Sequence, residues 1–146
     1  MQWNNKFIYP KSTRSISQGS RHYLVNEENL PSVTPILKAT ETEEKKAKLA
    51  EWKNRIGHKQ AEIISREATS RGSSMHDYLE KFLLGKLNMD LLGNNTREKM
   101  MADQIIENGL RDKLSEIWGC EATLYYPGKY AGAADCIGIY KIKKRS

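Results

Sequence analysis

The chain has 146 residues and a hydrophobic fraction of 38%, which is enough for one compact domain with a modest core. Its formal net charge of +6 and pI near 9.3 favour a polyanionic partner, although charge alone does not separate DNA from RNA or an anionic membrane surface. No apolar run approaches the roughly 20 residues of a membrane span, and the N-terminus lacks the apolar stretch of a secretion signal. We therefore expect a soluble protein of the cytoplasm.

The first 20 residues carry few regularly spaced apolar side chains, and KSTRSISQGS is basic and rich in serine. We expect a flexible N-terminal arm at residues 1–20, which either contacts phosphate or is simply solvated. The next residues, RHYLV, are a short β-prone run, and the turn-like NEENLP follows. In SVTPILKAT, Thr34 as N-cap and Pro35 as first helical residue predict a short helix.

The middle of the chain favours helices. Residues 41–56 predict an amphipathic helix that ends at Gly57, since apolar side chains recur at near-helical intervals among charged ones. Three further helices are predicted over residues 58–71, 74–85 and 96–114, with Gly72, Gly85 and Gly93 as the breaks. The first two-thirds of the chain are thus mainly helical.

The segment EIWGCEATLYYPGKYAGAADCIGIYKI changes character, because aromatic and branched residues surround a Pro127-Gly128 turn signal. It predicts a β-hairpin with a loop at residues 127–129. Counting outward from a Tyr126–Tyr130 pair places Glu121 opposite Asp135 on one face.

Alternation would put Asp135 beside Ala133, Ile137 and Ile139, an apolar environment that is costly for a lone carboxylate. A divalent cation would offset that cost and hold both acids ionised, and without it one acid should have a raised pKa. Two alternatives stay open: a register slipped by one residue separates the acids, or Glu121 lies on an exposed strand.

The same counting pairs Cys120 with Cys136 on the other face. CxxC spacing is absent, so packed, reduced thiols are the expectation.

A second candidate segment is RGSSMHDYLEKFL. Ser73 or Ser74 can cap a helix, and His76 and Glu80, four residues apart, project from one helical face. His76 can give a neutral imidazole nitrogen to a metal or position a phosphate, while Glu80 can orient the imidazole or a water. The alternative is a partly buried histidine with satisfied hydrogen bonds and a solvated glutamate.

Three blocks, LPSVTPIL, RGSSMHDYLEKFL and CEATLYYPGKYAGAADCIGIY, in this order resemble RecB-like exonucleases of the PD-(D/E)XK superfamily, as found in phages and in mitochondrial genome maintenance. The resemblance covers roughly residues 21–140. It implies an α/β (α+β) fold in which N-terminal helices pack on a hairpin that begins a mixed-sheet, restriction-endonuclease-like core. Residues 21–146 would be a partial nuclease domain.

The resemblance also implies hydrolysis of DNA phosphodiester bonds with Mg²⁺ or Mn²⁺. His76 and Asp135 would then be metal-site residues, and Glu121 and Glu80 would occupy the family's acidic positions. The expected DNA contacts are Arg71, Ser73 and Lys129. The expected substrate is linear ends or single-stranded DNA, in a phage-infected or bacterial cell.

The sequence departs from the family after Asp135. The family has an Asp/Glu-x-Lys strand about a dozen residues later, whereas CIGIYKIKKRS contains no acid, and Lys141, Lys143 and Lys144 do not replace a missing negative ligand. We expect weak metal binding, little cleavage by the chain alone, an exposed hairpin edge, and association with a polypeptide that supplies the missing strands. Two other hypotheses are a noncatalytic DNA-binding module and a helical interaction protein with structural acids.

Overall fold

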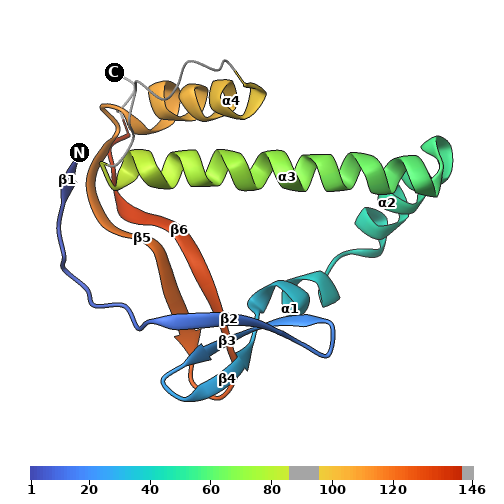
Figure 1. The fold of residues 1–146 in the computed structure, drawn as a ribbon, viewed down its shortest axis with the longest axis horizontal. Helices are drawn as coiled ribbons and strands as arrows, with labels where there is room; N and C mark the ends of the chain where they lie inside the picture. The colour runs from blue at the N-terminus through green and yellow to red at the C-terminus, as the bar shows by residue number, and fades with distance from the viewer. Residues whose placement is uncertain (86–95, 143–146) are drawn as a thin grey trace.

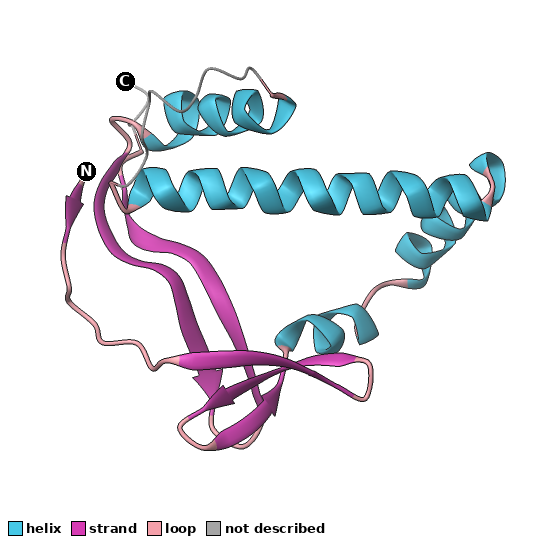
Figure 2. Cartoon of the chain, viewed as in Figure 1, coloured by secondary structure: helices cyan, strands magenta, loops and turns pink. Residues whose placement is uncertain are grey.

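The computed structural model describes residues 1–85 and 96–142, so the predictions for Gly93, Lys143 and Lys144 lie outside it. The described part has an α+β fold with two three-stranded sheets, as Figures 1 and 2 show. In the mixed sheet, β1 (Gln2–Trp3) runs parallel to β5 (Leu114–Tyr126), which pairs antiparallel with β6 (Tyr130–Tyr140). The other sheet is an antiparallel meander of β2 (Ser12–Ser17), β3 (Ser20–Val25) and β4 (Glu28–Pro31).

Residues 1–20, for which we expected an arm without regular structure, contain β1 and β2. The polar side chains of β2 point mostly to solvent, but its backbone pairs with β3 from Ser12 to Ser17. Strand formation here depends on the partner strand and not on an apolar pattern. Two aromatic side chains also hold residues 1–20 against the rest of the protein. The Trp3 indole donates to the Leu83 carbonyl at 2.9 Å, and the Tyr9 ring lies directly against Gly119.

The helix α1 (Val33–Ala39) begins two residues earlier than predicted. Its N-cap is Ser32, whose hydroxyl accepts from the Thr34 amide, so the assignment of Thr34 as the cap was wrong. Ser32 is buried and bridges to Ala131 of β6, which ties the start of the helix to the hairpin. The preceding RHYLV strand is confirmed as β3, but NEENLP forms a turn only at Asn26 and Glu27 and then enters β4.

Two helices form the middle of the chain. α2 (Glu43–Ile56) ends at Gly57 as predicted, with φ of 90° at that glycine. α3 (His58–Leu83) is continuous, so the predicted break at Gly72 and the predicted cap at Ser73 or Ser74 are wrong. One helical glycine costs only about 1 kcal/mol. Packing at the two ends of α3, where Ala61 and Leu83 are buried, outweighs that cost.

The fourth predicted helix is shorter than expected. α4 (Arg97–Ile105) continues into a short π-helix (Ile106–Leu110), after which Asp112 adopts a left-handed conformation and β5 begins. No helix among residues 1–85 and 96–142 combines the length and apolar character that crossing a bilayer requires.

Two hydrophobic clusters hold the β5–β6 hairpin at both ends. Near its turn, Ala131 packs against Tyr23, Val25 and Leu30 of the second sheet. At its base, Leu114 and Ile117 pack against Leu83 at the end of α3. The hairpin therefore spans from α3 to the β2–β3–β4 sheet (Figure 1), and its central residues lie between two fixed points.

Candidate metal centre

The register of the hairpin is the one expected from its turn. Tyr126 pairs with Tyr130, and the pairs Cys120–Cys136 and Ala122–Ala134 flank Glu121 and Asp135 on either side. The two acids are therefore opposite one another, and the alternative of a register slipped by one residue is excluded. The loop at residues 127–129 is also confirmed.

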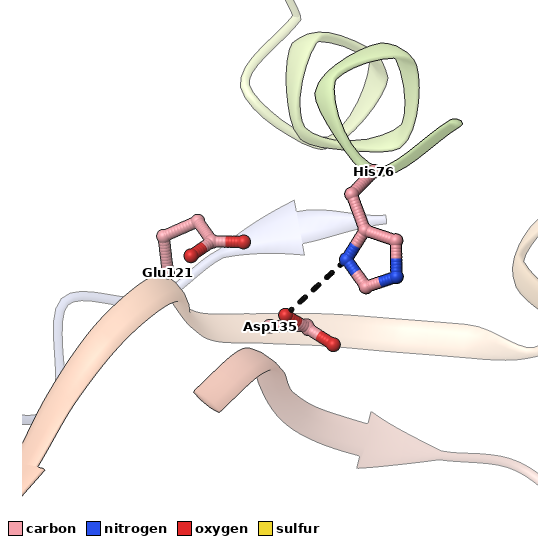
Figure 3. A group of neighbouring side chains, drawn as sticks. All are labelled: His76, Glu121 and Asp135. Atoms are coloured by element: carbon pink, nitrogen blue, oxygen red, sulfur yellow. Dashed lines mark ion pairs between the residues drawn. The ribbon is translucent and has the colours of Figure 1, made fainter. Parts of the chain in front are cut away.

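Helix α3 brings His76 to these two acids. Nδ1 of His76 lies 3.5 Å from Oδ1 of Asp135. One donor atom each from His76, Glu121 and Asp135 lie within 4.8 Å of one another. Figure 3 shows the imidazole descending from the helix toward the Asp135 carboxylate, with the Glu121 carboxylate alongside. A helix residue and two strand residues, about 45 to 60 positions apart in sequence, thus converge.

Glu121 adopts an unusual backbone conformation in the middle of a strand. Its φ is +49°, a left-handed value that costs a residue with a Cβ atom about 1–2 kcal/mol. Such strain persists only where the surrounding structure imposes it, and it is concentrated at functional sites. Here the flanking pairs hold the backbone, and the strained residue is one of the three converging side chains.

The environment of Asp135 differs from the prediction. Its side chain is 68% exposed, so the expected apolar surroundings were wrong. The reason is an open, largely polar cleft of about 700 Å³ into which Asp135 faces. Strand alternation alone predicted its apolar neighbours on β6 but not the helix and second sheet that enclose the polar space.

The cleft brings together most of the predicted site residues. His76, Glu80, Glu121 and Asp135 line it together with Ser73. Arg71 and Lys129 are not among its lining residues; Lys129 lies in the hairpin turn, next in sequence to Tyr130. The two predicted DNA contacts at Arg71 and Lys129 are therefore not part of this cleft.

Three charged residues of the cleft were not predicted as site residues. They are Arg14 on β2, Arg21 on β3 and Asp77 on α3. Arg14 donates to Glu121 at 3.4 Å and lies over the ring of Tyr23. The basic character of the first 20 residues was the available signal, but nothing in the sequence indicated that β2 packs beside the hairpin.

The pKa of Glu121 is raised above its ordinary value of 4.5. Burial is the largest cause, followed by the negative charges of Asp135 and Glu80, while Arg14 acts in the opposite direction. This confirms the expectation that one acid of the pair has a raised pKa when no cation offsets their repulsion.

The charges and distances of the cleft fit a divalent cation. Four carboxylates and two guanidinium groups leave a formal charge of −2 when His76 is neutral. Two ligands of one ion at about 2.1 Å lie at most about 4.2 Å apart, so a separation of up to 4.8 Å needs only a small rotamer adjustment. Carboxylates suit Mg²⁺ and Mn²⁺, and the imidazole favours the transition metal of the two.

The two cysteines are free, as expected. Burial is the main cause that raises the pKa of both thiols, to about 11 for Cys120. They pack beside the Leu83, Leu114 and Ile117 cluster. Their role in this structure is packing.

Comparison of the chain with protein-family models, with curated proteins and with solved structures finds no match.

Proposed function

We propose that this cleft is the metal centre of a DNA-hydrolysing enzyme, an exonuclease of the RecB-like branch of the PD-(D/E)XK superfamily. The observation that supports the proposal most is the convergence of His76, Glu121 and Asp135 within 4.8 Å. The proposed family is based on the resemblance of the three sequence blocks and their order. The net charge of +6 fits a polyanionic substrate. The proposed substrate is linear DNA ends or single-stranded DNA. The proposed setting is a phage-infected or bacterial cell.

Each residue has a specific task in this proposal. His76, Glu121 and Asp135 would hold Mg²⁺ or Mn²⁺, and the bound ion would polarise the scissile phosphate and lower the pKa of an attacking water. Glu80, one turn along α3 from His76, accepts a hydrogen bond from a water in the cleft. Ser73 contacts a phosphate oxygen of the DNA from the same face of the helix.

A structural role for the three side chains explains less. His76 is 49% exposed and Asp135 is 68% exposed, and exposed ion pairs contribute only about 0–1 kcal/mol to stability. Four acids line one cleft, and one of them, Glu121, has a strained backbone; both features are unfavourable for stability alone. Metal binding gives a reason for both features.

Among the described residues, the lining of the cleft includes no lysine of the kind that positions the attacking water in the family. Apart from the bridge between Ala131 and Ser32, no described strand pairs with the outer side of β6, and we propose that a strand of another polypeptide pairs there. We therefore propose cation binding and DNA binding as the primary tests, with nucleotide release as a secondary one.

The first test is a calorimetric titration with Mn²⁺ of the wild-type chain, Asp135→Ala and His76→Ala. The matched control is Asp77→Asn, which removes a carboxylate of the same cleft that pairs with Lys81 and lies outside the ligand group. We expect the first two substitutions to weaken Mn²⁺ binding at least tenfold and the control to leave it within about twofold. Equal binding by all four proteins would refute the metal centre.

A noncatalytic DNA-binding module is the second candidate, supported by the two arginines in the cleft. It predicts DNA affinity that falls with salt but is unchanged by chelation of divalent cations or by Asp135→Ala. Fluorescence anisotropy with a labelled single-stranded oligonucleotide, with Ca²⁺ and with EDTA, separates the two functions. The metal centre requires tighter binding in Ca²⁺, and only when Asp135 is present.

A further inference from the structure

Arg14 connects the second sheet to the metal centre. Its Nη2 lies 3.4 Å from Oε2 of Glu121, and its guanidinium lies 5.8 Å from the ring centroid of Tyr23. Among residues 1–85 and 96–142, Glu121 is the acid with which Arg14 makes an ion pair. A guanidinium therefore already neutralises the carboxylate that a cation in the cleft would use.

We propose that Arg14 exchanges partners during binding: it neutralises Glu121 while the cleft holds no cation, and it binds a phosphate oxygen of the polynucleotide once a divalent cation has taken Glu121. This inference rests on the proposed function, because it needs both a cation and a phosphodiester substrate. It assigns Arg14 as a substrate-binding residue whose availability depends on the metal.

The ion pair is easily broken. Its 3.4 Å separation is long for a charge-assisted hydrogen bond, and the side chains of Arg14 and Glu121 are 53% and 29% exposed. Exposed pairs of this kind contribute little to stability. A divalent cation at Glu121 carries a larger charge than the guanidinium and repels it, which weakens the ion pair further.

The freed guanidinium stays in the cleft. Arg14 pairs in register with Tyr23, whose ring is buried and forms a fixed support beneath the arginine. A guanidinium offers five N–H donors in a planar arrangement that matches two oxygens of a phosphate. His76 and Asp135 line the same cleft, so a phosphate at the cation is within the space that Arg14 faces.

Arg21 provides a matched comparison. It lies on β3, and the register places it on the same face of the β2–β3 ribbon as Arg14, because residues of paired strands that oppose one another share a face. It lines the same cleft, but no ion pair joins it to Glu121 within the part of the chain that the structure describes. Arg21 can therefore contact phosphate without competing with the cation.

The test measures two affinities on three variants, Arg14→Gln, Arg14→Lys and Arg21→Gln, after thermal melts have shown that each folds. The first readout is Mn²⁺ affinity by calorimetry without DNA. The second is affinity for a labelled single-stranded oligonucleotide in Ca²⁺ by anisotropy. Neither readout requires catalytic turnover.

The expected effects of Arg14→Gln have opposite signs. Its Mn²⁺ affinity should rise about two- to fivefold because the competing charge is gone, while its oligonucleotide affinity in Ca²⁺ should fall about tenfold. Arg14→Lys should keep wild-type Mn²⁺ affinity and still lose several-fold in DNA affinity, because an ammonium group lacks the planar pair of donors. Arg21→Gln should weaken DNA binding and leave Mn²⁺ affinity unchanged.

Unchanged or weaker Mn²⁺ binding by Arg14→Gln would overturn the exchange, and unchanged DNA binding would overturn the phosphate contact. If Mn²⁺ affinity depends on Asp135 but not on Arg14, only this inference fails. If the wild-type chain binds no Mn²⁺, the proposed function fails and the exchange fails with it.

Discussion

Replacement of Glu121 by glycine should give a more stable protein than replacement by alanine, and both changes should remove a ligand of the proposed metal centre. Glu121 has a φ of +49° within β5. A residue with a Cβ atom loses about 1–2 kcal/mol in that conformation, and glycine loses none of it. The proper reference is Glu121→Ala, which removes the same carboxylate and its ion pair with Arg14 but keeps the Cβ atom.

The magnitude follows from two opposing effects. Relief of the left-handed conformation favours glycine by about 1–2 kcal/mol, and the greater backbone freedom of glycine in the unfolded chain opposes it by about 0.5–1 kcal/mol. We expect Glu121→Gly to be more stable than Glu121→Ala by roughly 0.5–1 kcal/mol. For a chain of this size that difference raises the melting temperature by about 1–4 °C.

Thermal melts followed by circular dichroism measure this difference, and Mn²⁺ titrations of both variants should show the same loss of binding. Gln18 gives a control, because it lies in the β2–β3 turn with φ of +52° and outside the cleft. Gln18→Gly should exceed Gln18→Ala in stability by a similar amount and keep wild-type Mn²⁺ affinity. A melting temperature for Glu121→Gly at or below that of Glu121→Ala would show that the backbone at this position is not strained.

Three further outcomes follow from the same structure. Gly72→Ala should raise the free energy of unfolding by about 0.5–1 kcal/mol in urea melts, because an added Cβ meets no atom within 4 Å inside α3; a loss of stability would contradict a continuous helix. Native Cys120, with its pKa raised to about 11 from 9.0, should react with iodoacetamide roughly 100-fold more slowly near pH 8 than an unperturbed thiol; rates that match those in guanidinium would contradict its burial. The raised pKa of Glu121 means that the folded state favours the protonated acid, so its contribution to stability is present below about pH 4.5 and is lost as the pH rises through the folded-state pKa. Glu121→Gln should therefore gain stability relative to the wild type as the pH rises above about 4.5, and a constant difference would contradict the shift.

The hairpin could be predicted in detail because its information is local. Pro127 and Gly128 mark the turn, and counting outward from it gives the observed pairs as far as Gly119 and Ile137, beyond which irregularities shift the register. The pairing of Glu121 with Asp135 follows from that counting. The exposure of Asp135 did not follow, since it depends on α3 and β2, which come from distant parts of the chain.

The structure around Gly72 and Arg14, in contrast, could not be predicted from the local sequence. A glycine followed by two serines resembles a helix boundary, yet α3 continues through it because packing at its ends outweighs a local preference. Arg14 lies on a strand of polar residues that becomes regular only by pairing with β3. No periodicity in residues 12–17 could place this side chain beside a hairpin more than 100 residues away.

Three features that lower stability meet in the same cleft. Gly72 weakens the helix that carries His76, and Glu121 holds a left-handed backbone conformation. The pKa of Glu121 is raised, first by its burial and then by the negative charges of Asp135 and Glu80. If these three features lay in separate parts of the chain, each would be an ordinary small loss of stability. Local rules are broken together mainly where function requires it. A divalent cation would offset the repulsion among the carboxylates. At Gly72, an added Cβ would meet no atom within 4 Å, which leaves space for a phosphate beside this residue. This coincidence adds an independent argument for a ligand site to the convergence of His76, Glu121 and Asp135.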